Sequence, residues 1–249
     1  MLSTGEPIVI FGATSLIAEH VARLFAERRH SIILVARDNE KLQVLSQDLL
    51  SRGASSVVTH VVDLADVNNL EQAFGDIVQH EKQVGCILVA HGVLPDQEAV
   101  QDDLAAILAS WSVNFQSPMM LSVMATRYFE ARGKGTLAVI TSVAGVRARK
   151  SNYVYGAAKG ALSLFLQGLR NRYGKTDIDV IDIRPGFVDT PMTAHLKKGP
   201  LFASAEDVAK GIVQAIDRRQ EIIYLPWFWR PIMFIISSIP EKLFKRMSL

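Results

Sequence analysis

Three residues in the middle of the chain, Ser142, Tyr155 and Lys159, have types and spacing that suit proton transfer to a carbonyl oxygen. Tyr155 and Lys159 are four residues apart, which places them on one face of a helix. An ammonium one turn away is expected to lower the pKa of the phenol. Tyr155 can then donate a proton to a carbonyl oxygen while a hydride adds to the carbon, and Ser142 can hydrogen-bond the same oxygen.

A fourth polar residue, Asn114, lies in the segment SVNFQ upstream of these three. We expect it to hold a water molecule that returns a proton to the Tyr–Lys pair. The pattern Tyr-x-x-x-Lys alone is common on helix surfaces. Here the pattern is stronger evidence for a catalytic site, because Ser142 ends a β-branched run thirteen residues before Tyr155.

Seven short β-branched runs alternate with segments whose apolar residues recur at helical spacing, for example Ile17, Val21, Leu24 and Phe25. The runs are 7–12, 31–36, 56–62, 86–92, 136–142, 179–185 and 221–226. This alternation predicts an α/β fold, a Rossmann-like doubly wound parallel sheet with helices on both faces. We expect one domain over residues 1–225, followed by an apolar and basic C-terminal extension over residues 226–249. Ligands of such folds bind at the carboxyl ends of the strands.

The loop FGATSLIA at residues 11–18 joins the first predicted strand to the first helix, where a dinucleotide-binding loop belongs. Of the three glycines of that fingerprint only Gly12 is present, and Leu16 and Ala18 occupy the other two positions. Thr14 and Ser15 partly compensate, because their hydroxyls and backbone N–H groups can bind an anion at a helix N-terminus. An ordinary strand–turn–helix with a Ser/Thr cap is the alternative.

The ends of the next strands add to the nucleotide interpretation. Arg37 follows the second strand at the position where an acidic residue would bind a ribose 2′-hydroxyl, so it favours NADP(H), with NAD(H) as the alternative. The alternative is that Arg37 is a solvent-exposed arginine at the start of a helix, which the same sequence would also fit. We expect His91 to be a loop histidine with a backbone partner rather than a catalytic group.

With these motifs in order, the chain resembles the short-chain dehydrogenase/reductase family over residues 7–225. The resemblance implies an NAD(P)(H)-dependent oxidoreductase that forms dimers or tetramers, in which the stretch RPGFVDT at 184–190 contacts the nicotinamide end. An oxidised nicotinamide would add to the effect of Lys159 on the phenol. The cofactor is then expected to contact Gly12, Thr14, Ser15, Leu16, Ile17, Arg37, Asp63, Leu64, Ala90, Gly92, Tyr155, Lys159, Pro185, Gly186, Val188 and Thr190.

Within this family, residues 147–156, 190–201 and 226–246 are similar to reductases that act on a ketopentose linked to a polyprenyl phosphate carrier. Basic residues near the expected site are those that a phosphodiester would require. These are Arg147, Arg149, Lys150, Lys197 and Lys198. A solvated basic loop is the alternative interpretation of the same charges.

The composition limits the remaining function classes. A net charge of +2 over 249 residues does not indicate a nucleic-acid partner. The single cysteine, Cys86, excludes an intramolecular disulfide and suits a reducing compartment. We find no metal-binding pattern, and no basic and apolar leader that would indicate a signal peptide, so we expect a cytoplasmic protein.

The extension at residues 226–249 is rich in apolar residues and carries a balance of +3, from two Arg and two Lys against one Glu. Pro231 suits the first turn of a short helix that Pro240 ends, which leaves too few residues for a membrane span. Trp227 and Trp229 favour a membrane interface. We therefore expect residues 227–249 to lie on the inner face of a membrane, with packing against the domain or a partner subunit as the alternative.

Three function hypotheses remain from the sequence. The first is a reductase of a lipid-linked ketosugar, and the second is a reductase of a soluble or acyl keto substrate. The third is a dinucleotide-binding regulatory protein without turnover, which the glycine-poor loop suggests. The presence of Asn114, Ser142, Tyr155 and Lys159 together argues against the third, because a sensor does not need all four.

Overall fold

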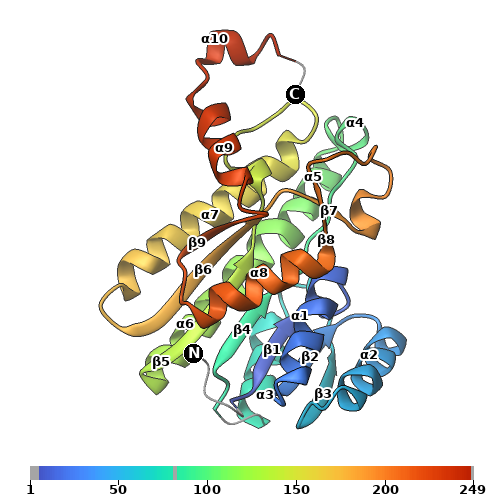
Figure 1. Ribbon diagram of the computed structural model, residues 1–249, viewed down its shortest axis with the longest axis vertical. Coiled ribbons are helices and arrows are strands. Elements are labelled where there is room, and N and C mark those ends of the chain that lie inside the picture. Colours follow the sequence, from blue (N-terminus) through green and yellow to red (C-terminus); the bar gives the residue numbers. More distant parts are fainter. Residues whose placement is uncertain (1–5, 81–82, 248–249) are drawn as a thin grey trace.

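A computed structural model describes residues 6–80 and 83–247, and its centre is a seven-stranded parallel sheet (Figure 1). The strand order is β3-β2-β1-β4-β5-β6-β9, so the chain runs from the middle to one edge and then to the other. The strands are β1 (Ile8–Phe11), β2 (Ser31–Ala36), β3 (Ser56–Val61), β4 (Cys86–Val89), β5 (Lys134–Ile140), β6 (Asp177–Pro185) and β9 (Ile222–Leu225). All seven predicted strands are present, and the doubly wound fold class is confirmed.

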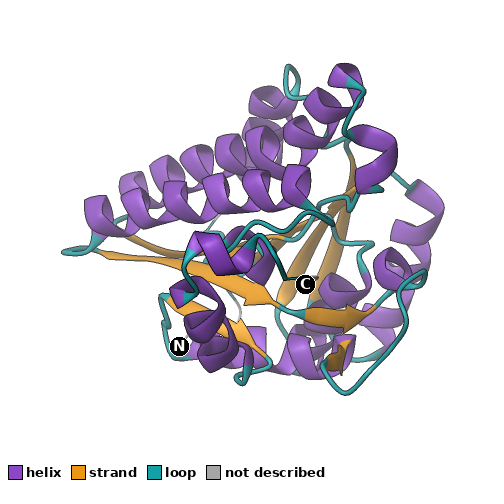
Figure 2. Ribbon diagram, turned by 90° about the horizontal axis from the view of Figure 1, so that it is seen from above, coloured by secondary structure: helices purple, strands orange, loops and turns teal. Residues whose placement is uncertain are grey.

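Helices cover both faces of this sheet and create two hydrophobic cores (Figure 2). Residues alternate along each strand, so Ile8 and Ile10 of β1 belong to one core while Val9 and Phe11 belong to the other. The first face is covered by α1 (Leu16–Glu27), α2 (Asn39–Ser51) and α8 (Ala205–Asp217). The second face is covered by α3 (Leu70–His80), α6 (Ser117–Arg132) and α7 (Tyr153–Tyr173).

Short elements surround the carboxyl ends of the strands. They are α4 (Gln97–Val100), α5 (Leu104–Trp111), the π-helical turn η1 (Ser112–Gln116), and the 3₁₀ turns η2 (Val143–Gly145) and η3 (Pro191–Thr193). A second, two-stranded parallel sheet pairs β7 (Phe187–Asp189) with β8 (Phe202–Ser204). The sequence analysis did not anticipate this sheet, because strands of three residues are too short to give a periodic pattern.

The C-terminal segment forms two short helices, α9 (Trp229–Ser238) and α10 (Glu241–Phe244), which extend beyond the main body in Figure 1. Pro231 lies in the first turn of α9 and Pro240 follows its end, as predicted. Trp229, however, is buried and packs in a cluster with Val143 and Met233. The expectation that Trp229 faces a membrane surface is therefore wrong.

The opposite side of this C-terminal segment is exposed. Trp227 is 77% exposed, and the other exposed large apolar residues of the segment are Phe234, Ile235, Leu243 and Met247. No described helix combines the length and apolar character needed to cross a membrane. The extension thus divides into a side that packs on the domain and an apolar side that faces outward.

Candidate active site

A cavity of about 1620 Å³ lies at the carboxyl ends of the strands, as the doubly wound topology predicts. Every residue predicted to contact the dinucleotide lines this cavity, from Gly12 and Arg37 at one end to Pro185, Gly186 and Thr190 at the other. Ser142, Tyr155 and Lys159 line it too. The fold therefore brings together residues that are up to 178 positions apart in the sequence, counting from Gly12 to Thr190.

The first loop makes a tight turn from β1 into α1 although two of its expected glycines are missing. Gly12 has φ +80°, and a Cβ there would lie 2.6 Å from the backbone N of His91, so only glycine fits this position. Ser15 caps α1, because its hydroxyl accepts a hydrogen bond from Ala18 N at 3.3 Å. Leu16 lines the cavity and also packs against the core beneath α1.

Arg37 follows β2 and lies exposed at the rim of the cavity. It makes no ion pair or hydrogen bond with any residue that the structure describes, because Asp38 beside it caps α2 and pairs with Lys41 instead. An unpaired guanidinium and the N-terminus of α1 therefore face the same cavity. This donor set suits a ligand that carries several phosphates, such as a dinucleotide.

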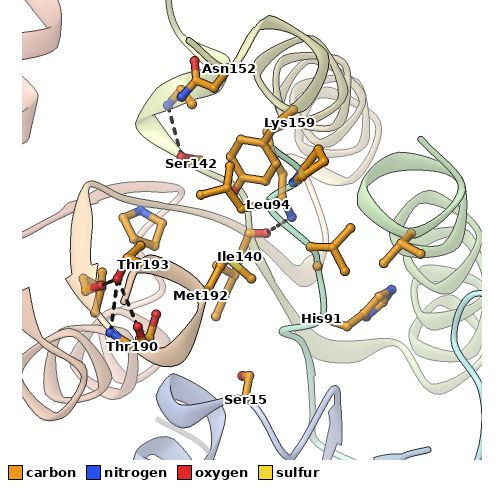
Figure 3. A pocket seen from close by; sticks show the side chains of 18 of the residues that line it. Ser15, His91, Leu94, Ile140, Ser142, Asn152, Lys159, Thr190, Met192 and Thr193 are labelled. Atoms are coloured by element: carbon orange, nitrogen blue, oxygen red, sulfur yellow. Dashed lines mark hydrogen bonds between the residues drawn. The ribbon is translucent and has the colours of Figure 1, made fainter. Parts of the chain in front are cut away.

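Ser142, Tyr155 and Lys159 form the polar wall of the cavity (Figure 3). Ser142 follows β5, and its hydroxyl accepts a hydrogen bond from Ala144 N at 3.1 Å. The same hydroxyl acts on the Tyr155 phenol and lowers its pKa. Lys159 donates from Nζ to the carbonyl oxygen of Ile140 at 3.1 Å, and this Nζ lies 5.9 Å from the centre of the Tyr155 ring. The end of one strand and one helix thus position all three side chains.

Burial is the largest cause of the pKa shifts of Tyr155 and Lys159 in this wall. It raises the pKa of Tyr155 to about 12, against the hydrogen bond with Ser142, which lowers it. Burial also lowers the pKa of Lys159 to about 8, and the charge of Asp182 opposes this shift. The expected lowering of the phenol pKa by Lys159 is therefore wrong for the protein alone. A protonated phenol nevertheless suits a group that must donate a proton.

Asn114 lies behind this wall and does not line the cavity. It is fully buried in the π-helical turn η1, where its Nδ2 donates to Val93 O at 2.9 Å and to Ser110 Oγ at 3.2 Å. Its Oδ1 accepts from Val93 N at 3.1 Å. A Cβ on Gly92 would lie 3.0 Å from this Oδ1 and 3.3 Å from Lys159 Nζ. The side chain of Asn114 thus positions the 92–93 backbone beside Lys159, and its role in holding a water remains a proposal.

Only two of the five predicted basic residues line the cavity, namely Arg149 and Lys150. The Arg149 guanidinium lies 5.9 Å from the centre of the Phe187 ring, and burial lowers its pKa. Lys197 does not line the cavity, and Lys198 pairs with Asp189 at 2.7 Å on the surface. Lys197 and Lys198 are both exposed in the segment after η3, so the structure does not place them in the cavity as expected.

Arg147 also points away from the cavity, toward the C-terminal segment. It donates to Ile239 O at 3.2 Å and to Glu241 Oε2 at 2.8 Å, and its guanidinium stacks 4.3 Å from the centre of the Phe244 ring. The prediction that Arg147 binds a substrate phosphate is wrong for this reason. Arg147 instead fastens α10 to the loop that follows Ser142.

His91 lines the cavity, but its partner is a side chain rather than the expected backbone group. Its Nε2 hydrogen-bonds Ser117 Oγ at 2.9 Å. Burial lowers the pKa of His91 to about 3, so the ring stays neutral at physiological pH. A group this reluctant to take up a proton does not serve as a general base near neutrality.

Gln97 and Asn152 line the cavity as well, and the sequence analysis did not identify them. Gln97 Oε1 accepts a hydrogen bond from Val154 N at 3.0 Å, which fixes the start of α7. Partners separated by 57 residues leave no periodic or motif signal. Among the described residues, no cluster of His, Cys, Asp or Glu could hold a metal ion.

Comparison with known families and structures agrees with this geometry. Residues 6–200 match the family model for short chain dehydrogenases. An uncharacterised oxidoreductase of Mycobacterium tuberculosis (strain ATCC 25618 / H37Rv) is 31% identical over 241 residues, covering 97% of this chain and 96% of the relative. An 11-beta-hydroxysteroid dehydrogenase-like protein of Arabidopsis thaliana is 28% identical and covers 96% of this chain and 79% of its own.

Two solved structures share the fold. A short-chain dehydrogenase from Sphingobium yanoikuyae in complex with NADPH has a TM-score of 0.82 at 23% identity, covering 95% of this chain and 97% of its own. A bulky-bulky ketone specific alcohol dehydrogenase from Comamonas testosteroni has a TM-score of 0.81 at 22% identity and covers 96% of both chains. The family match over residues 6–200 and the 31% identical relative together show that the chain belongs to the short-chain dehydrogenase/reductase family of oxidoreductases.

Proposed function

We propose that this protein reduces a ketone to an alcohol with NADPH, and that the ketone is a pentose carried on a polyprenyl phosphate. One observation carries the reductase assignment. Ser142, Tyr155 and Lys159 share a wall of the cavity whose other end reaches the unpaired Arg37. This arrangement argues against a regulatory dinucleotide sensor, because a sensor has no use for a buried phenol and ammonium beside each other.

When bound, NADPH would supply the hydride, two electrons and one proton, that the carbonyl carbon takes up. Side chains of the protein bind and protonate the carbonyl oxygen. Ser142 hydrogen-bonds the carbonyl oxygen, and Tyr155 donates its phenolic proton to that oxygen as negative charge develops there. Lys159, held by Ile140 O, stabilises the phenolate that remains until a proton is restored from solvent. The ketone thus gains one hydride and one proton.

The choice of NADPH over NADH rests on Arg37. Its guanidinium has no partner in the described chain, and it follows β2, where the ribose of the adenosine lies in doubly wound folds. A 2′-phosphate would supply the missing charge. The similar Sphingobium yanoikuyae dehydrogenase is a complex with NADPH, which supports the same choice.

Three features support the lipid-linked ketopentose. The similarity of residues 147–156, 190–201 and 226–246 is to a decaprenylphosphoryl-2-keto-pentose reductase, an enzyme of cell-envelope sugar synthesis. Arg149 and Lys150 at the cavity supply cations for a phosphodiester. The exposed apolar side of the C-terminal segment lies next to the same loop, through the contact of Arg147 with α10. A soluble or acyl ketone is the alternative substrate.

The same segment supports contact with the inner face of a membrane. Trp227, Phe234 and Ile235 are exposed, and Lys242, Lys245 and Arg246 add positive charge that anionic lipids attract. A protein that rests there meets a lipid-linked substrate without extracting it from the bilayer.

We also propose a homo-oligomer, because Leu104 and Leu108, one turn apart on α5, are exposed and a second copy would cover them.

An activity assay tests this proposal directly. The purified protein is mixed with NADPH or NADH and with a ketopentosyl polyprenyl phosphate, the matching water-soluble ketopentose phosphate, or an acyl ketone. We expect fastest oxidation of NADPH with the lipid-linked ketone. Equal rates on the soluble ketone would favour the alternative substrate, and no turnover with any ketone would contradict the reductase.

A further inference from the structure

We propose that Gln97 and Asn152 form a hydroxyl-binding pair that selects ketones bearing a hydroxyl group next to the carbonyl. The inference rests on the proposed reductase and assigns two residues that the family motifs do not include. Both side chains line the cavity. Each holds a buried polar atom with no hydrogen-bond partner, a donor on Gln97 and an acceptor on Asn152.

The orientation of the Gln97 amide is fixed by the fold. Its oxygen must face Val154 N, because a backbone N–H needs an acceptor, and the Oε1 to N distance is 3.0 Å. The NH₂ group of Gln97 is therefore the end left without a partner. Gln97 is 6% exposed, and no described protein group accepts from this donor.

Asn152 supplies the complementary group. It is the residue before α7 and lies three positions before Tyr155, at the end of the helix from which the phenol reaches into the cavity. Figure 3 shows Asn152 above Ser142 at the same wall. Its Oδ1 is buried without a partner. Gln97 bonds Val154 N, two residues after Asn152, so both side chains lie at the start of α7. The proposal places one substrate hydroxyl here, accepting from Gln97 Nε2 and donating to Asn152 Oδ1, which would satisfy both atoms.

The free-energy cost of leaving these two buried atoms without a hydrogen-bond partner determines the expected substrate selectivity. A buried polar group without a partner is costly, and folded proteins rarely keep one unless a ligand or an ordered water completes it. A site that hydrogen-bonds a substrate hydroxyl discriminates strongly against the analogue that lacks it, because the groups of the site stay unpaired. We therefore expect at least about a tenfold preference in kcat/KM for the hydroxylated ketone.

The test compares 2-hydroxycyclohexanone with cyclohexanone, using NADPH and the full-length protein. Wild type is expected to favour 2-hydroxycyclohexanone in kcat/KM. Gln97→Met removes the donor and keeps the chain length, and Asn152→Ala removes the acceptor, so each should bring the ratio of the two kcat/KM values toward one. Gln97→Glu keeps the acceptor for Val154 N and replaces the NH₂ donor with a carboxylate oxygen. It should also lower the ratio, because one hydroxyl proton cannot satisfy two acceptors.

The outcomes separate the hydroxyl pair from the reductase itself. If Gln97→Met and Asn152→Ala lower kcat/KM for both ketones by the same factor, the two residues have a structural role only and the inference is wrong. The inference is also wrong if wild type reduces the two ketones equally well, although the reductase then stands. If the protein reduces the ketopentosyl polyprenyl phosphate but neither cyclohexanone, the reductase stands and the hydroxyl pair is wrong, because 2-hydroxycyclohexanone carries the hydroxyl that the pair selects. No turnover with any of the three ketones would contradict the proposed function.

Discussion

The Lys159 ammonium lies 5.9 Å from the centre of the Tyr155 ring while its Nζ donates to the carbonyl oxygen of Ile140. Ile140 ends β5, two residues before Ser142. The strand that delivers Ser142 therefore also holds the lysine, and α7 delivers the phenol. Because the three groups depend on one strand end and one helix, their spacing is set by the sheet rather than by a loop.

The pKa of Lys159 predicts how ketone reduction depends on pH. Burial lowers that pKa to about 8, so the side chain is charged below this value and neutral above it. The charged form stabilises the phenolate of Tyr155, so we expect kcat at saturating NADPH to fall as pH rises through about 8. Steady-state rates between about pH 6 and pH 10 provide the measurement. A rate that stays constant to pH 10 would show that the Lys159 charge is not needed.

The substitution Tyr155→Phe removes the proton donor and little else, because the ring remains. We expect kcat for ketone reduction to fall at least about 10²-fold, the usual scale for a general acid. The melting temperature and the enhancement of NADPH fluorescence on binding should stay near those of wild type. Turnover close to wild type would exclude Tyr155 from the proton transfer.

Much of the fold and of the active site could be predicted, since both depend on local patterns. β-branched runs separated by helical spacing gave the seven strands, and Tyr155 and Lys159 are neighbours on any helix that contains them. The carboxyl ends of parallel strands meet at one edge, so residues after each strand were expected to converge. The cavity lining agrees with that expectation.

Features that depend on distant partners could not be predicted in the same way. Arg147 and Arg149 are two residues apart and have the same chemistry, yet Arg147 pairs with Glu241, 94 positions away, and Arg149 faces the cavity. Likewise, nothing local in the sequence indicates that Gln97 caps α7 or that Asn114 lies in a π-helical turn. Such contacts are decided by how the elements pack.

Arg37→Ala tests the choice of cofactor. If Arg37 binds the 2′-phosphate, the KM for NADPH should rise about tenfold to a hundredfold, the value of a charge-assisted contact, while the KM for NADH changes little. Arg172→Ala is a matched control, because Arg172 lies near the far end of α7 and pairs with Glu130. Equal changes in the KM values of both cofactors would show that Arg37 does not distinguish them.

Co-sedimentation with vesicles of anionic and neutral lipids at low salt tests the membrane contact. Deletion of residues 227–249 is unsuitable, because it removes the buried Trp229 together with the exposed residues. The double substitution Phe234→Ser and Ile235→Ser instead changes only exposed side chains of α9. We expect wild type to bind anionic vesicles and this variant to bind much less.

Val44→Ser is the control for that experiment, since Val44 is equally exposed on α2, away from the C-terminal segment. It should bind vesicles like wild type. If wild type ignores anionic vesicles, or if the α9 variant binds as well as the control, the exposed apolar side serves a protein contact instead.

The transfer of deuterium from NADPH to the product tests the central claim most directly. Wild-type protein is incubated with NADPH carrying deuterium at the transferable position of the nicotinamide and with the ketopentosyl polyprenyl phosphate, and the sugar is analysed by mass spectrometry. We predict one deuterium on the new carbinol carbon of each product molecule. The Tyr155→Phe variant should form this product at least about 10²-fold more slowly than wild type. An alcohol product without deuterium, or no product from wild type, would contradict hydride transfer to a lipid-linked ketone at this site.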